Sequence, residues 1–406
     1  MSVNNKVPEI RFKGFSGEWE NLTLGDLGSV AMNKRIFKHQ TTITGDVPFF
    51  KIGTFGKQPD AFINKALFDE YKAKYPYPVA GDLLLSASGS IGRVVEYKGE
   101  DQYFQDSNIV WLKHDGKIDN AFLKVFYSMV KWSGLEGSTI KRLYNKNILD
   151  TEISTPERQE QTAIGNYFQK LDSLINQHQQ KHDKLSNIKK AMLEKMFPKP
   201  GETVPEIRFK GFSGEWVENN LGELIDIRSA ARVHKEQWTE AGVPFFRTSD
   251  VVSIYKGQEN TKAYISHEIY HGLSEKIGKV TKDDLLITGG GSIGIPYLVP
   301  NDSPLYFKDA DLLWLKNNEK FNGYFLYTFF FSVSFKQHIK SISHTGTIAH
   351  YTIEQAKATP INTCSDEEQT AIGNYFQKLD ALINQHQQQI AKLNNIKQAC
   401  LSKMFI

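Results

Sequence analysis

The sequence predicts a mixed α/β protein, of the α+β kind, in which two similar domains alternate with two long helices. The chain has 406 residues and repeats long stretches of itself. One repeated stretch carries apolar residues at the spacing of a coiled coil. The segments between the repeats diverge, but they hold short strand-like apolar runs in the same order. These three observations give the fold class.

Near-identical stretches mark the duplication. The thirteen residues VPEIRFKGFSGEW at 7–19 recur unchanged at 204–216, and residues 161–197 match 369–405 at 29 of 37 positions. A unit of about 200 residues is longer than a solenoid repeat, so we interpret the halves as duplicated domains. The predicted boundaries are 1–155 for the first domain, 156–199 for the first helix, 200–362 for the second domain and 363–406 for the second helix.

The diverged segments keep matching landmarks. In order, these are VPFF at 47–50 and 243–246, an Asp-Leu-Leu run at 82–85 and 284–287, Gly-Ser-Ile-Gly at 89–92 and 291–294, Trp-Leu-Lys at 111–113 and 314–316, and Thr-Ile at 139–140 and 347–348. We expect strands at 82–85, 109–112, 284–287 and 312–315, and aromatic-rich helices at 120–131 and 322–335. The repeated VPEIRFKGFSGEW segment is interpreted as an arm that packs on its domain.

The repeated helical segments carry one apolar seam each, with steps of four and three residues. The expected seam and subunit-contact residues are Ile164, Phe168, Leu171, Ile175, Leu185, Ile372, Phe376, Leu379, Ile383 and Leu393. A single helix of this length, about 60 Å, would expose its seam to water. We therefore expect the two helices to form an antiparallel coiled coil with a pseudo-twofold axis; a generic dimerising coiled coil is the alternative. His178 and His386 fall on this seam and are interpreted as interhelical polar contacts.

Composition limits the class of protein only loosely. Hydrophobic residues make up 40%, charged residues 23%, and the net charge is +3. No run of about 18 apolar residues predicts a membrane span, and the first residues do not resemble a secretory signal. The two cysteines, Cys364 and Cys400, match no metal spacing. These features favour a cytoplasmic protein without a membrane or metal partner.

Two patterns resemble enzyme motifs, and we interpret both as coincidental. Gly289–Gly294 matches G-x-G-x-x-G, but an extended segment follows it where a dinucleotide site needs a helix. Asp60, Glu70 and Lys72 resemble a nuclease set, but the second half has no equivalent. A tight turn and a surface loop are the favoured interpretations. No catalytic residue and no metal site are therefore predicted in this chain.

Taken together, the motifs resemble the specificity subunits of type I restriction–modification systems. The resemblance rests on Gly81-Asp-Leu-Leu-Leu followed by Gly-Ser-Ile-Gly, and on Glu160-Gln161 and Glu368-Gln369 ahead of the EQTAIGNYFQKLD-type helices. It covers essentially the whole chain. One departure is Lys282-Asp283-Asp284, where the first half has Gly81-Asp82.

The resemblance implies a non-catalytic subunit that reads a bipartite duplex DNA site, one half with each target-recognition domain. Its implied partners are two methyltransferase subunits and motor–nuclease subunits, which would hold S-adenosylmethionine, ATP and Mg²⁺; this chain would hold no cofactor. The rival hypothesis is a coiled-coil scaffold whose duplicated domains bind peptides or other ligands without DNA specificity.

Basic and polar residues that differ between the halves are the expected DNA contacts, because Arg and Lys hold phosphates and read guanine edges. The candidates are Lys34, Arg35, Lys38, Lys51, Arg93, Lys141, Arg142, Lys146, Arg228, Arg232, Lys235, Arg247, His344 and His350.

Overall fold

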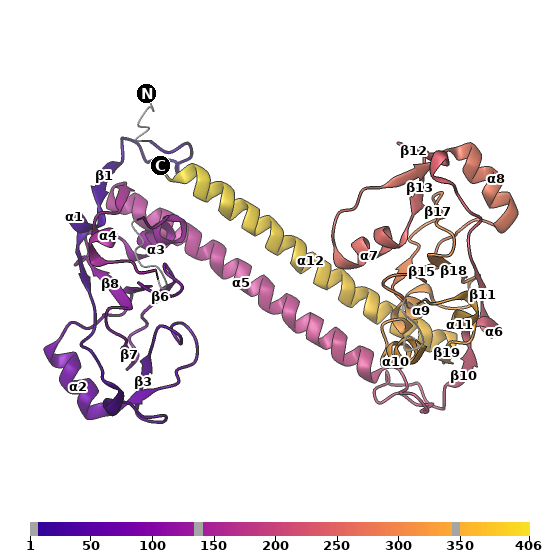
Figure 1. Ribbon diagram of the computed structural model, residues 1–406, viewed down its shortest axis with the longest axis horizontal. Coiled ribbons are helices and arrows are strands. Elements are labelled where there is room, and N and C mark those ends of the chain that lie inside the picture. The colour runs from indigo at the N-terminus through magenta and orange to yellow at the C-terminus, as the bar shows by residue number, and fades with distance from the viewer. Residues whose placement is uncertain (1–6, 134–140, 343–349) are drawn as a thin grey trace. The chain divides into compact units, whose positions relative to one another are not determined.

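The computed structural model describes residues 7–133, 141–342 and 350–406 (Figure 1). These residues form two compact units. The first unit runs to His178 and also takes Gln389–Ile406, and the second is Gln179–Gln388. The predicted boundaries treated the long helices as separate segments. In the structure each long helix contributes residues to both units.

The first unit holds the elements of the first diverged domain. In chain order they are β1 (Glu20–Thr23), α1 (Leu24–Leu27), β2 (Ser29–Ala31), the 3-10 turn η1 (Lys38–Gln40), β3 (Val47–Phe50), β4 (Phe62–Ile63), α2 (Lys65–Lys74), β5 (Leu83–Ser86), β6 (Val94–Glu96), β7 (Tyr103–Phe104), β8 (Ile109–Lys113), α3 (Asn120–Met129), α4 (Asn145–Leu149), β9 (Glu152–Thr155) and the first part of α5 (Arg158–Lys195).

The second unit repeats this order with additions. Its elements are β10 (Val217–Asn220), α6 (Leu221–Leu224), β11 (Asp226–Arg228), η2 (Lys235–Gln237), β12 (Trp238–Thr239), β13 (Val243–Phe246), α7 (Thr248–Lys256), β14 (Ala263–Ile265), α8 (His267–Ile277), β15 (Leu285–Thr288), β16 (Pro296–Leu298), β17 (Tyr306–Phe307), β18 (Leu312–Lys316), α9 (Gly323–Phe329), α10 (Val333–Ile342), α11 (Ile353–Lys357), β19 (Pro360–Thr363) and the first part of α12 (Asp366–Met404).

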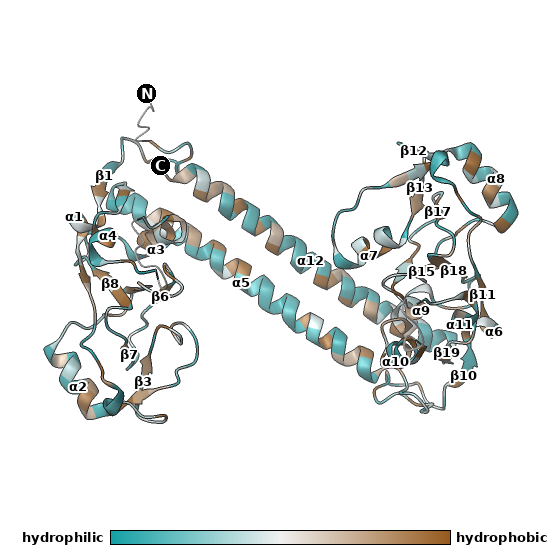
Figure 2. Cartoon of the chain, in the orientation of Figure 1, coloured by the Kyte–Doolittle hydropathy of each residue, from teal (hydrophilic) through white to brown (hydrophobic). Residues whose placement is uncertain are grey.

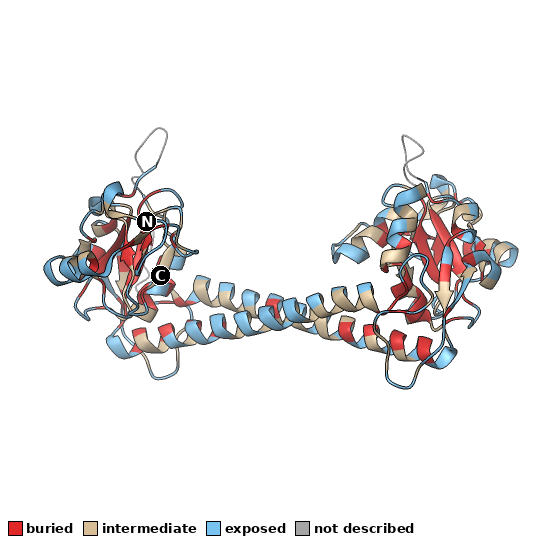
Figure 3. Ribbon diagram, turned by 90° about the horizontal axis from the view of Figure 1, so that it is seen from below, coloured by how far each residue is buried: buried red, intermediate tan, exposed pale blue. Residues whose placement is uncertain are grey.

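Equivalent sheets build the two domains. The central sheet has the order β2-β8-β5-β6 in the first unit and β11-β18-β15-β16 in the second, and all its pairs are antiparallel. A smaller sheet contains the VPFF strand, which pairs in parallel with β7 or β17. The apolar runs become β5, β8, β15 and β18. Their residues are mostly hydrophobic (Figure 2) and almost all buried (Figure 3). The predicted mixed α/β fold with two related domains is confirmed.

The single helix expected over 322–335 is wrong, because the chain turns between α9 and α10. Ser332 begins the second helix by accepting a hydrogen bond from the amide of Phe335. The break brings three aromatic rings together, with Phe330 and Phe335 only 4.7 Å apart and Phe329 5.7 Å from Phe335. A continuous helix would separate these rings over different faces. Burial of the aromatic cluster therefore outweighs continuation of the helix.

The predicted seam residues pack in the domain cores as well as along the helices. Ile164, Phe168 and Leu171 lie in the hydrophobic core of the first domain, and their repeats Ile372, Phe376 and Leu379 lie in the core of the second. Leu393 packs against the first core and Leu185 against the second. Ile175 and Ile383 are half-buried. The seam was expected to join helix to helix. In the structure most of it also anchors the helices in the domains.

Within each unit the two helix parts run antiparallel. In the first unit the Tyr167 hydroxyl lies 3.6 Å from Sγ of Cys400, and Nζ of Lys397 lies 2.5 Å from Oδ1 of Asp172. Residue numbers therefore increase along α5 while those of the contacting residues decrease along α12. In the second unit Lys189 lies 2.5 Å from Asp380. The equivalent ion pair therefore occurs in both units, between the start of one helix and the end of the other.

A close approach explains the glycine in the repeated helix. A Cβ at Gly165 would lie 2.6 Å from the Cβ of Ala121 and 2.8 Å from the backbone nitrogen of Phe122. A Cβ at Gly373 would lie 2.1 Å from the side-chain oxygen of Asn322. Only glycine lets α5 and α12 come this close to the first turns of α3 and α9.

Candidate nucleic-acid interface

The VPEIRFKGFSGEW arm joins each domain to the start of its long helix. Arg11 donates two hydrogen bonds to the carboxylate of Glu160, with Nε at 2.8 Å, and also bonds the Gly17 carbonyl. Arg208 repeats this arrangement with Glu368. The two carboxylates are 1% and 2% exposed, so these are buried, bidentate ion pairs. The interpretation of the arm as a segment that packs on its domain therefore accounts for Arg11 and Arg208.

The loop between β7 and β8, Gln105–Asn108, is the centre of the candidate interface in the first unit. Its first residue continues the β3–β7 pairing, because the Gln105 amide donates to the Phe50 carbonyl at 2.9 Å. Asp106 then accepts a hydrogen bond of 2.9 Å from Nε of Arg35. Asn108 accepts a hydrogen bond of 2.6 Å from the Ser88 hydroxyl. The loop therefore links the basic stretch before VPFF to the turn after β5.

The second unit has the same arrangement around Lys308–Asp311. The Lys308 amide donates to the Phe246 carbonyl at 2.8 Å, and the Gly289 amide donates to the Asp311 carbonyl at 2.9 Å. Arg232 forms an ion pair with Asp309 at 3.4 Å. In both loops the residue after the paired aspartate has a positive φ, 59° at Ser107 and 59° at Ala310. The two units therefore present one arginine each in an equivalent backbone setting.

The Gly-Ser-Ile-Gly segment is a tight hairpin turn in both units. The hydroxyl of Ser86 donates to the Ser90 carbonyl, and Thr288 does the same to Ser292. The segment connects β5 to β6 and β15 to β16. Because a strand follows the turn, and a dinucleotide site needs a helix there, the G-x-G-x-x-G match is a structural turn.

The turn also meets the polar segment that precedes each long helix. Ser88 forms an isolated β-bridge with Arg142, and Gly290 forms the equivalent bridge with His350. The Leu143 amide donates to the Ala87 carbonyl at 2.8 Å. Three stretches that are far apart in the sequence, the basic stretch, the turn and this segment, are thus joined around one loop in each unit.

The candidates fall into three groups by position. Those joined around the loops are Arg35, Arg142, Arg232 and His350. Exposed side chains elsewhere on the same segments are Lys34, Lys38, Lys141, Lys146 and Lys235. Those tied to other groups are Lys51 (ion pair with Asp60), Arg93 (hydrogen bond to the Phe55 carbonyl), Arg228 (ion pair with Asp226) and Arg247 (ion pair with Asp250). His344 lies outside the described residues.

Arg247 is the least suited of these to reading a base. Its guanidinium donates two hydrogen bonds to Asp250, at 2.8 and 3.1 Å, and another to the Thr261 carbonyl. The Asp250 carboxylate raises the pKa of Arg247. With its side chain only 23% exposed, Arg247 works as a structural clamp for α7. Arg35 and Arg232, by contrast, are 60% and 73% exposed.

An exposed guanidinium that pairs with one carboxylate through Nε keeps its terminal N–H groups for other acceptors. Arg35 pairs with Asp106 through Nε, and Arg232 pairs with Asp309 through Nε. The remaining terminal nitrogens can donate as a planar fork to two acceptors on one base edge or one phosphate. Such a held fork loses less conformational freedom on binding than a free lysine does.

The residues resembling a nuclease set lie in separate ion pairs. Asp60 pairs with Lys51, Glu70 with Lys74, and Lys72 with Asp101. Among residues 7–133, 141–342 and 350–406, no three metal-binding side chains converge. No helix in that part of the chain has the length and apolar character needed to cross a membrane.

The aspartates of the two loops were missed from the sequence. A signal for them exists, because the segments FQDSNIVWLK and FKDADLLWLK align in the two halves. The shared aspartate stands three residues before the buried strand in each copy. A search for basic residues alone passes over it, although the aspartate is what orients the arginine.

The fold and the two loops define a duplicated two-domain chain whose domains share two long helices. A family model described as "Type I restriction modification DNA specificity domain" matches twice, at residues 16–187 and 213–395. Together the matches cover most of the chain, and the chain belongs to this family.

Individual relatives agree with the family assignment. A Haemophilus influenzae protein named "Putative type I restriction enzyme specificity subunit S.HindORF215P" is 53% identical over 156 residues, which are 38% of this chain and 40% of that protein. The MjaVIII specificity subunit of Methanocaldococcus jannaschii is 22% identical over 65% of this chain and 61% of its own length. The chain thus spans 40% and 61% of these curated relatives. A crystal structure of an S subunit from M. genitalium has the same fold, with a TM-score of 0.59 at 18% identity, over 98% of this chain and 99% of that one.

Proposed function

We propose that the chain is the non-catalytic specificity subunit of a type I restriction–modification complex and binds a bipartite duplex DNA site. Each domain reads one half of the site. Methyltransferase and motor–nuclease subunits supply the chemistry in the cytoplasm, together with S-adenosylmethionine, ATP and Mg²⁺, and this chain holds no cofactor. The family membership supports the complex as a whole.

One observation carries the DNA-reading role: the exposed arginine held by an aspartate, present at equivalent places in both units. Around this shared pair the neighbouring side chains differ. Asn108 and Arg142 lie by the turn of the first unit, and Asp311 and His350 lie by the turn of the second. A shared anchor with different neighbours suits two domains that read different half-sites.

The experiment is to map modified DNA in cells that carry the whole system with one arginine changed. Arg35→Ala should relax one half of the recognised motif, and Arg232→Ala should relax the other half. Losing a bidentate contact costs about 1–3 kcal/mol of discrimination, roughly ten-fold or more. Two unaltered half-sites in both variants would contradict the assignment.

Lys98→Ala is the matched control. Its side chain is exposed and pairs with Glu96, which lies opposite Leu83 at the end of β5 remote from the turn. The motif should stay unchanged in this variant. A salt-dependent gel shift with randomised duplexes, using the complex, separates DNA recognition from a scaffold function: a scaffold would bind no duplex selectively.

A further inference from the structure

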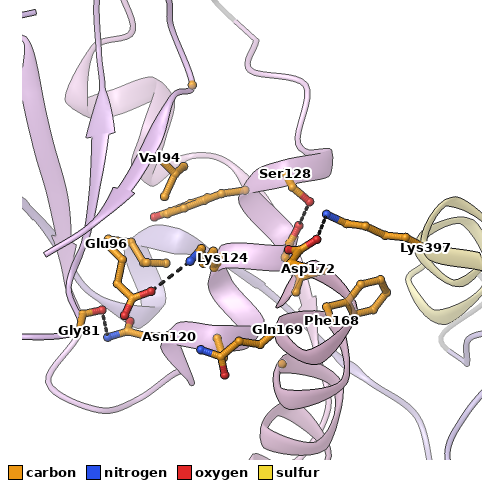
Figure 4. A pocket seen from close by; sticks show the side chains of 16 residues that line it. Gly81, Val94, Glu96, Asn120, Lys124, Ser128, Phe168, Gln169, Asp172 and Lys397 are labelled. Carbon is orange, nitrogen blue, oxygen red and sulfur yellow. Dashed lines mark hydrogen bonds and ion pairs between the residues drawn. The ribbon is translucent and has the colours of Figure 1, made fainter. Parts of the chain in front are cut away.

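A cavity of about 360 Å³ opens in the first unit between the turn, α3, α5 and the last part of α12 (Figure 4). Its lining includes Ala121, Lys124 and Ser128 on α3, and Asp172 on α5. Lys397 of α12 reaches the Asp172 carboxylate at 2.5 Å. Asp172 remains 52% exposed, so part of its carboxylate is free to accept a further hydrogen bond.

The second unit fills the equivalent space with its own aromatic side chains. Counted from the helix N-caps Asp119 and Asn322, the positions of Ala121 and Lys124 carry Tyr324 and Tyr327, and Phe331, two residues beyond the end of α9, packs next to Tyr327. The Tyr324 hydroxyl donates to Asp380 at 2.7 Å, and Asp380 is the repeat of Asp172. The three rings lie in contact, with centroids 5.3 Å and 5.1 Å apart along the series.

The charged partner is also the same in both units. Lys189 bonds Asp380 and stands over the ring of Phe331 at 5.7 Å, and Lys189 is the repeat of Lys397. The first unit therefore keeps the acceptor, the lysine and the helix framework but lacks the aromatic filling. Burial and the neighbouring Asp380 raise the pKa of Tyr324, so its hydroxyl stays a proton donor.

We propose that the cavity of the first unit receives a tyrosine side chain from the methyltransferase subunit, whose hydroxyl donates to Asp172. This inference rests on the proposed function. The occupant's chemistry comes from the second unit, where a tyrosine already makes this bond. The occupant is expected to be a protein side chain because the second unit fills this space with side chains of its own, and the proposed function gives this chain a methyltransferase subunit as protein partner. A buried aromatic anchor of this kind typically dominates an interface.

The first test uses 4-methylphenol, the tyrosine side-chain analogue, with the full-length chain. Ligand-observed NMR should detect binding, with toluene binding more weakly because it lacks the donor. Asp172→Asn should reduce the preference for 4-methylphenol over toluene. Ala121→Tyr, which copies the second unit, should abolish binding of both probes. Equal binding to wild type and Ala121→Tyr, or no binding to wild type, would overturn the inference.

A reciprocal variant guards against a folding defect. Tyr324→Ala should open a second site and raise the number of bound 4-methylphenol molecules from one to two. Melting curves of both variants show whether the chain stays folded. If Ala121→Tyr is unfolded, Ser128→Phe replaces it, because Ser128 is exposed and lines the same cavity.

The second test measures assembly with the purified methyltransferase subunit. Ala121→Tyr or Ser128→Phe should raise the Kd about 30-fold, the usual loss for one central aromatic anchor. The control Lys13→Ala, at an exposed residue outside the cavity lining, should leave the Kd unchanged. An unaltered Kd in the filled variants, with the normal DNA motif still modified, would refute the cavity's role while leaving the proposed function intact. If the wild-type complex modified DNA without sequence specificity, the proposed function itself would be refuted.

Discussion

Lys189 donates to the carboxylate of Asp380 at 2.5 Å, and so fastens the last part of α5 to the first part of α12 within the second unit. The repeats of these residues, Lys397 and Asp172, make the same contact in the first unit. The pair is thus part of the duplicated framework, and its environment differs between the copies. Asp380 is 21% exposed, whereas Asp172 is 52% exposed.

A double-mutant cycle should expose this difference. Lys189→Ala combined with Asp380→Asn should give a coupling energy of about 1 kcal/mol in denaturant unfolding, near the upper end for partly exposed pairs. The cycle of Lys397→Ala with Asp172→Asn should give a smaller value, because water screens the more exposed carboxylate. Equal coupling energies in the two cycles would show that exposure does not set the strength of the pair.

Breaking the buried pair between Arg11 and Glu160 should destabilise the first unit. Glu160→Gln leaves a guanidinium without its bidentate partner, and loss of one member of a buried pair costs about 3 kcal/mol. Arg11→Lys should lose less, because a lysine still supplies a charge without the planar fork. Lys13→Ala, on an exposed neighbour in the arm, serves as control and should change little.

Thermal unfolding with limited proteolysis would measure these effects. In limited proteolysis, the protease should cut Glu160→Gln in the arm and at the start of α5. The corresponding Glu368→Gln variant should sensitise the second unit in the same way, since Arg208 makes the same bonds. Wild-type melting in Glu160→Gln would mean that the pair does not contribute to stability.

Gly165→Ala should destabilise the chain, although alanine normally favours a helix. The added Cβ would meet Ala121 at 2.6 Å and backbone nitrogen at 2.8 Å, and backbone cannot move aside cheaply. Overpacking of this kind costs about 1–3 kcal/mol. Gly272 in α8 is the matched control, because a Cβ there meets nothing within 4 Å. Gly272→Ala should stabilise by about 0.5–1 kcal/mol. Opposite signs in urea unfolding are the expected result, and a gain at Gly165 would contradict the close packing.

Much of the fold could be predicted from the sequence because it depends on local periodicity. The short apolar runs around Leu84 and Leu286 became central strands, and the four-three spacing from Ile164 onward became a long helix. The break after Phe329 could not be found this way, because it depends on which aromatic rings meet in the core.

The candidate site was only partly accessible to the same reasoning. Basic side chains such as Arg35 could be chosen by charge, but charge does not reveal whether an arginine is held ready or already engaged. Arg247 looked equivalent and is clamped by Asp250. That distinction depends on contacts between residues far apart in the chain. The bridge of Ser88 to Arg142 is of the same kind.

The last prediction concerns the length of the two long helices. Asp172 and Lys189 are 17 residues apart in α5, and their repeats Asp380 and Lys397 are also 17 residues apart in α12. An insertion in one helix alone would make these lengths unequal, and one ion pair or the packing of Leu185 or Leu393 would be lost.

Matching insertions of four residues after Gln180 and after Gln388 keep the two helix lengths equal. They add about 6 Å and about 40° of rotation. One or two base pairs of DNA add about 3–7 Å and about 34–70°. The paired insertion should therefore lengthen the unread gap in the modified motif by one or two base pairs and leave both half-sites unchanged. The single insertion after Gln180 should lower modification of every site. Sequencing of modified DNA in cells carrying each variant measures both outcomes, and an active paired variant that keeps the original gap would show that the helices do not set the spacing.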